Sequence, residues 1–66
     1  MDNLVQKAFY HSRKSIKDIT EGAGLCKPTV IKALVYGHIG RFTTMSRLAE
    51  YFGIEFKVFL DWWEKQ

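Results

Sequence analysis

Apolar residues recur along the chain at intervals of three and four, the spacing that places side chains on one face of an α-helix. This period predicts five helices, over residues 3–12, 16–23, 28–35, 44–52 and 55–65. Side chains with good N-cap chemistry precede three of them: Asp2 or Asn3, Ser15, and Thr43 or Thr44. The pattern therefore predicts an all-α fold, a small five-helix bundle.

The second and third predicted helices form the centre of the pattern. Three apolar residues share one face of each helix: Ile16, Ile19 and Ala23, then Val30, Ala33 and Leu34. Gly24 follows the first helix, where a left-handed residue usually ends a helix. Leu25 is expected to lie in the wedge between the helices, and Pro28 suits the first turn of the next one. Two short helices joined by such a turn are typical of a helix-turn-helix.

The last predicted helix, residues 55–65, is apolar on two sides. Phe56, Phe59, Leu60 and Trp63 fit one face, and Val58 and Trp62 fall on another. A helix that is apolar on two sides is usually covered on both, and Trp is enriched at the centres of protein interfaces. We therefore expect a homodimer interface at the following residues: Val58, Trp62 and Trp63. The alternative is that Trp62 lies half-exposed against the first or fourth helix.

Three segments carry a resemblance to known DNA-binding proteins. SIKDI (15–19) and AGLCKPTV (23–30) resemble the DNA-binding helices of bacterial and phage repressors, and the first is similar to the Lac-repressor headpiece. MSRLAEYFGI (45–54) resembles the fourth helix and Gly-Ile hinge of the lambda-repressor and Cro family, the XRE-type domains. The resemblance implies a lambda repressor-like bundle and a small Cro-like transcriptional repressor of phage or mobile-element origin. It would bind operator DNA as a dimer through a recognition helix at Pro28–Val35.

The chain departs from the family pattern at three positions in this region. Thr20 stands where the family usually has Ala, Gly22 lies inside a helix, and Cys26 replaces the usual Ser or Thr. The glycine costs about 1 kcal/mol relative to Ala in a helix, and the cysteine gives up a good N-cap. These differences bear on the detailed DNA contacts more than on the fold.

The expected DNA-binding residues gather around the proposed recognition helix. Its outer face carries, or has near its edge, Lys27, Pro28, Thr29, Ile31 and Lys32. The lysines can donate to guanine or hold phosphates, whereas Ile31 suits either thymine methyls or another protein. Further expected contacts to the DNA backbone come from two segments: Lys14, Ser15 and Lys17 at the start of the second helix, and His38, Arg41 and Thr43 after the third. The alternative for the helix start is a water-capped end.

Charge is distributed unevenly along the sequence. Residues 1–47 contain eight Lys or Arg and three acids, a net +5, and residues 48–66 contain two bases and four acids, a net −2. A basic half that coincides with the helix-turn-helix is what attraction to phosphate requires.

Composition limits the other function classes. Sixty-six residues suit one domain, and 47% hydrophobic residues indicate a packed globule. No apolar run approaches the roughly 20 residues that span a bilayer. One cysteine and two histidines make a disulfide or metal site implausible and fit a reducing cytoplasm, and we expect no cofactor. The sequence contains no nucleophile–base set and no phosphate-binding glycine loop, so it does not indicate an enzyme.

The main alternative function is a helix-turn-helix module that binds a protein partner, such as polymerase, a toxin or a host enzyme.

Overall fold

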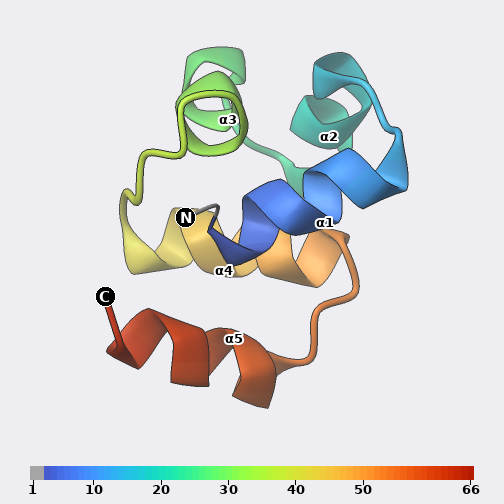
Figure 1. The fold of residues 1–66 in the computed structure, drawn as a ribbon. Coiled ribbons are helices and arrows are strands. Elements are labelled where there is room, and N and C mark those ends of the chain that lie inside the picture. The colour runs from blue at the N-terminus through green and yellow to red at the C-terminus, as the bar shows by residue number, and fades with distance from the viewer. Residues whose placement is uncertain (1–2) are drawn as a thin grey trace.

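A computed structural model describes residues 3–66 of the chain. Within these residues there are five helices and no strand: α1 (Leu4–Ser12), α2 (Ile16–Ala23), α3 (Lys27–Leu34), α4 (Phe42–Tyr51) and α5 (Phe56–Glu64). Figure 1 shows α2 and α3 side by side at one end, α1 and α4 in the middle, and α5 at the other end. The all-α prediction is confirmed. None of the helices in the described range has the length and apolar character needed to cross a membrane.

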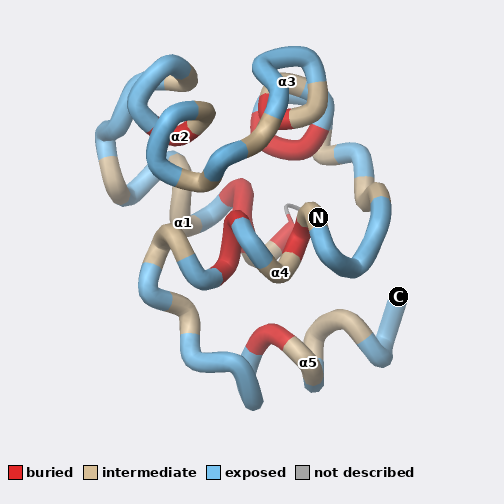
Figure 2. The backbone as a smooth tube through the Cα atoms, turned by 180° about the vertical axis from the view of Figure 1, so that it is seen from behind, coloured by how far each residue is buried: buried red, intermediate tan, exposed pale blue. Residues whose placement is uncertain are grey.

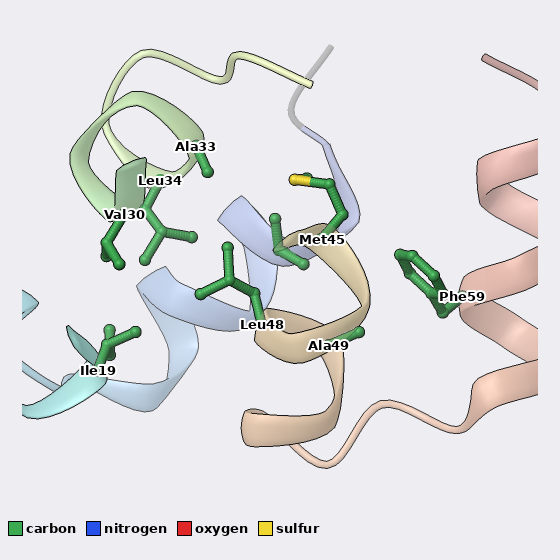
Figure 3. Close-up of a cluster of buried hydrophobic side chains, with 9 residues drawn as sticks. Ile19, Val30, Ala33, Leu34, Met45, Leu48, Ala49 and Phe59 are labelled. Atoms are coloured by element: carbon green, nitrogen blue, oxygen red, sulfur yellow. The ribbon is translucent and has the colours of Figure 1, made fainter. Parts of the chain in front are cut away.

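Every helix contributes to one hydrophobic core, and α4 lies at its centre. The buried apolar residues are Val5, Ile19, Val30, Ala33, Leu34, Met45, Leu48, Ala49 and Phe59. Figure 3 shows Leu48 of α4 pointing toward the α2 and α3 side chains, with Phe59 of α5 on the opposite side of α4. α5 packs mainly on α4, so α4 is the main connection between α5 and the rest of the core.

Side-chain caps and a glycine turn set three helix ends where the sequence predicts them. Asn3 caps α1 by accepting from the Gln6 amide at 2.8 Å, and Ser15 caps α2 by accepting from the Asp18 amide at 3.1 Å. Gly24 ends α2 in the left-handed conformation, with φ of 68°. Cys26 precedes α3 without a side-chain cap, as expected. The alternative cap of α1, Asp2, lies outside the described residues.

The predicted start of the fourth helix is wrong. α4 begins at Phe42, so Thr43 and Thr44 lie within its first turn, and neither is the N-cap. Arg41 takes the N-cap position without a side-chain hydrogen bond. Phe42 explains the earlier start, because its ring centroid lies 5.5 Å from that of Phe59 and 5.3 Å from that of Trp63. Tertiary packing on α5 therefore decides where α4 begins.

The other boundaries shift by single residues. α3 begins and ends one residue before the predicted Pro28–Val35. Val35 is instead the exposed C-cap residue, because Val30, Ala33 and Leu34 already fill the inner face. α5 is one residue shorter at each end than the predicted 55–65.

The predicted inner face of the last helix is only partly correct. Phe59 is fully buried, but Phe56 is 56% exposed at the rim of a groove between α4 and α5. α5 lies at the end of the molecule, and the groove beside Phe56 is lined by α4, by Gly53 and Ile54 and by α5 itself. Trp62 and Trp63 are half-buried against the core of their own chain.

Candidate nucleic-acid interface

The helix α3 separates an apolar inner face from a basic outer face. Val30, Ala33 and Leu34 are buried, whereas Lys27, Pro28 and Lys32 are exposed, and Thr29 and Ile31 are half-buried. Figure 2 shows the exposed outer rims of α2 and α3 at the end of the molecule far from α5. The lysines of α3 are therefore accessible to a large partner, as predicted, whereas Ile31 of the predicted outer face is half-buried.

A cleft of about 300 Å³ lies between α3 and the start of α4. We call it the α3–α4 cleft, and it is lined by Thr29, Lys32, Ala33, His38, Gly40, Arg41, Thr44 and Met45. The buried Ala33 and Met45 belong to the core, and the accessible lining is about half polar and half apolar, with Lys32, His38 and Arg41 as its basic side chains. Four residues predicted from sequence to contact DNA come together here: Thr29, Lys32, His38 and Arg41.

The segment after α3 is folded back by backbone hydrogen bonds. The His38 amide donates to the carbonyl oxygen of Lys32 at 2.9 Å. Gly37 makes the reversal possible because its φ of 69° is one that side-chain-bearing residues rarely adopt. This fold returns His38 toward α3 and leads the chain on to Arg41 at the start of α4.

The basic side chains around α3 are not neutralised by acidic ones. Among residues 3–66 the only ion pair joins Lys65 to Asp61 at 3.0 Å, and it lies on α5. The Lys and Arg side chains of residues 3–47 have no described carboxylate within salt-bridge distance; these are Lys7, Arg13, Lys14, Lys17, Lys27, Lys32, Arg41 and Arg47. Their charges are therefore available to an anionic partner.

The start of α2 lies apart from the α3–α4 cleft. Ser15 uses its hydroxyl oxygen to cap α2, which leaves the exposed Lys17 and the first amides of the helix near the surface. Lys14 does not reach the cleft either, because its ammonium lies 5.5 Å from the centre of the Tyr51 ring at the end of α4. The remaining predicted contact, Thr43, is exposed in the first turn of α4, next to Thr44, which does line the cleft.

Sequence reasoning missed two features of this region. Thr44 and Gly40 line the cleft, although neither is among the residues that the sequence predicts to contact DNA. Gln6 is 93% buried, since only 7% of it is exposed, and its side-chain amide donates to the Leu34 carbonyl oxygen of α3 at 3.2 Å. The signal for Gln6 was present, because Asn followed three residues later by Gln is a capping-box pattern.

The residues predicted to form a dimer interface differ in their exposure. Val58 is 50% exposed on α5, whereas Trp62 and Trp63 pack on Phe59 with ring centroids 6.0 and 6.2 Å away. Trp63 also meets Phe42 edge to face. Because Phe59 lies on α5 itself, the contact of Trp63 with Phe42 is the aromatic pair here that ties α5 to another helix. Val58 has a larger exposed fraction than either tryptophan.

Among residues 3–66 there is no candidate metal site and one free cysteine. No three His, Cys, Asp or Glu side chains between residues 3 and 66 come together in a way that could hold a metal ion. Cys26 is exposed at the start of α3 with a free thiol. Comparison of the chain with protein-family models, with curated proteins and with solved structures gave no match.

Proposed function

We propose that the protein is a sequence-specific DNA-binding transcriptional regulator of the Cro-like repressor kind. In this proposal α2, the turn at residues 24–26 and α3 form a helix-turn-helix, and α3 enters the major groove. The packing of α2 on α3 and the left-handed Gly24 between them support this arrangement.

The observation that carries the proposal is the exposed and unpaired basic surface on and beside α3. Lys27 and Lys32 project from the helix, and Arg41 reaches the same side across the α3–α4 cleft. Positive side chains without acidic partners gain most from releasing the counterions of DNA, which is the main source of protein–DNA affinity. Within the helix-turn-helix the exposed Asp18 and Glu21 lie on α2, whereas α3 itself carries no acidic residue.

Two kinds of contact are assigned to this surface. Lys32 and Thr29 are the candidates for donating to base edges, and the apolar surface of Ile31 and Pro28 suits thymine methyl groups. Ser15 and Lys17 at the start of α2, with Arg41 and Thr43 beside α4, are assigned to phosphates that fix the register of the protein on the duplex.

The proposed active form is a symmetric dimer. One α3 per half-site then requires half-sites about 34 Å apart on one face of the duplex. The exposed Val58 on α5 supports a self-association surface that leaves the outer face of α3 free. Sedimentation velocity on Val58→Glu tests it, with Val35→Glu as a control because Val35 is 49% exposed but lies at α3. Only Val58→Glu should shift the protein to monomer, and equal behaviour of the two variants would contradict this interface.

The decisive test of DNA binding is selection from a random duplex pool, followed by gel shifts over a range of salt. If Lys32 reads a base, Lys32→Ala should cost about 1–3 kcal/mol of binding free energy and relax the preference at one position. Lys57→Ala is the matched control, because Lys57 is equally an exposed lysine but lies on α5. Unchanged affinity and preference in Lys32→Ala would remove the base-reading role.

Failure of the wild-type protein to bind any duplex at low salt would contradict the proposed function. It would favour the protein-binding alternative, since Pro28 and Ile31 give the outer face of α3 an apolar component.

A further inference from the structure

The end of α3 is held by a side chain from another helix. The last carbonyl groups of any α-helix lack partners inside the helix and must find them elsewhere. In α3 the Ile31 carbonyl accepts from the Val35 amide at 2.8 Å, and the Lys32 carbonyl accepts from His38. The Leu34 carbonyl accepts from the side-chain amide of Gln6, which comes from α1.

Gln6 is itself held in one orientation. Its Oε1 accepts from the Asn3 amide at 3.2 Å, and its own backbone amide donates to Asn3 Oδ1. With its oxygen occupied in this way, its Nε2 is directed to Leu34. The side chain therefore connects the first turn of α1 rigidly to the last turn of α3.

Gln6 also contacts the turn that follows α3. Gly37 packs on the Gln6 amide so closely that a Cβ at position 37 would lie 3.0 Å from Oε1 and 3.1 Å from Nε2. One residue later, the His38 amide bonds back to Lys32. The same buried amide thus fixes both sides of the reversal that arranges Lys32, His38 and Arg41 around the α3–α4 cleft.

We infer that Gln6 is a positioning residue for the DNA interface. It acts through Leu34 and Gly37 and sets the distance between the α3 lysines and the basic residues of the following loop. The inference rests on the proposed function and adds a specificity determinant that lies wholly inside the protein. Because the phosphate and base contacts must form at the same time, loosening this connection should remove contacts to DNA and not only lower the stability of the fold.

The test compares Gln6→Glu and Gln6→Met with the wild type in DNA binding. Glu keeps the acceptor for Asn3 but removes the donor to Leu34, and Met removes both hydrogen bonds at similar length. Gln66→Glu is the matched control, because the Gln66 side chain also donates to a helix carbonyl, that of Trp62 at 2.8 Å, but at the exposed end of α5. Folded fraction is measured by circular dichroism, and binding is measured where each variant is folded.

Both Gln6 variants should bind the selected duplex about tenfold more weakly, and losing one phosphate contact should flatten the slope of log K against log salt by about 0.9. Amide NMR shifts should move over residues 34–41 in these variants and stay in place in Gln66→Glu. Unchanged affinity and slope in a folded Gln6 variant would overturn the positioning role while leaving the proposed function intact. If both Gln6 variants unfold, Gly37→Ala is the substitute, because its Cβ presses on the Gln6 side-chain amide from the other side. Unchanged DNA binding by Gly37→Ala would also overturn the positioning role of Gln6. Absence of binding by the wild type would overturn both proposals together.

Discussion

At the scale of single residues, a glycine inside α2 has a reason that lies in another helix. Gly22 lies where α2 approaches the end of α4, and a Cβ there would come within 2.9 Å of Tyr51 Cδ1 and closer to Cε1. A glycine in a helix normally costs about 1 kcal/mol relative to Ala. Here the missing side chain lets the Tyr51 ring pack on the helix backbone, so the local cost serves a tertiary contact.

We predict that Gly22→Ala destabilises the protein although it improves helix propensity. The overlap with Tyr51 should outweigh the propensity gain and lower the free energy of unfolding by about 1–2 kcal/mol, as overpacking does. Urea unfolding of the wild type and the variant measures this. In a Tyr51→Ala background the obstacle is gone, and the same substitution should become stabilising by up to about 1 kcal/mol. An equal effect in both backgrounds would show that Tyr51 does not account for Gly22.

At the scale of helices, the sequence predicts that the five helices exist and, to within a residue, where most of them begin and end. It does not predict the contacts between them. The caps at Asn3 and Ser15 and the turn at Gly24 are local features, readable within four residues. The start of α4 was mispredicted because Phe42 packs on Phe59 and Trp63, a contact across the sequence that outweighs the capping preference of Thr43.

The candidate site was predictable to a similar degree. The face of α3 follows from helical periodicity, so the outward lysines could be named from the sequence. The meeting of Lys32 with His38 and Arg41 could not, because it depends on the reversal at Gly37 and on Gln6 from α1. The capping-box spacing of Asn3 and Gln6 indicates their mutual hydrogen bonds, but not the contact of Gln6 with α3, since Gln is mostly exposed in proteins.

The uncapped start of α3 gives a prediction at this scale. Cys26 has the extended backbone of an N-cap, with φ −75° and ψ 145°, but makes no side-chain hydrogen bond to the helix. Cys26→Ser should supply that bond and raise the free energy of unfolding by about 0.5–1 kcal/mol, because Ser is among the best N-cap residues. Thermal melts should show a higher midpoint.

The reverse exchange at α2 is the control for this prediction. Ser15→Cys removes a cap that accepts from the Asp18 amide, so it should lower the midpoint by a similar amount. If both exchanges move stability in the same direction, capping does not explain the difference between these two helix starts.

At the scale of the whole molecule, α4 joins two ends of different character. The basic end carries α2, α3 and the α3–α4 cleft, whereas the other end carries α5 and its aromatic cluster (Figure 1). Phe42 connects them, because it belongs to the first turn of α4, beside the cleft residue Arg41, and packs on Phe59 and Trp63. The docking of α5 therefore supports the part of α4 from which Arg41 extends.

Two phenylalanines on α5 test how much the fold depends on this docking. Phe59 is fully buried and its ring lies within 6.4 Å, centroid to centroid, of Phe42, Phe56, Trp62 and Trp63, whereas Phe56 is 56% exposed. Phe59→Ala should cost about 3–5 kcal/mol of unfolding free energy, the usual range for a buried Phe. Small domains have only about 5–15 kcal/mol in total, so this variant should be largely unfolded or close to it at 25 °C. Phe56→Ala, the same substitution one turn earlier, should cost less than about 1 kcal/mol, because its side chain remains largely in water.

The same variants show whether α5 and the rest of the chain unfold together. Both tryptophans lie on α5, so their fluorescence reports the docking of that helix, while far-ultraviolet circular dichroism reports all five helices of residues 3–66. Since Phe59 shares one core with Met45 and Ala49 of α4, we expect the two signals to change together in urea for the wild type and for Phe56→Ala. A fluorescence transition at lower urea than the circular dichroism transition would show that α5 detaches first. In that case the basic end would be stable without its aromatic support, and Phe42 would not couple the two ends of the molecule.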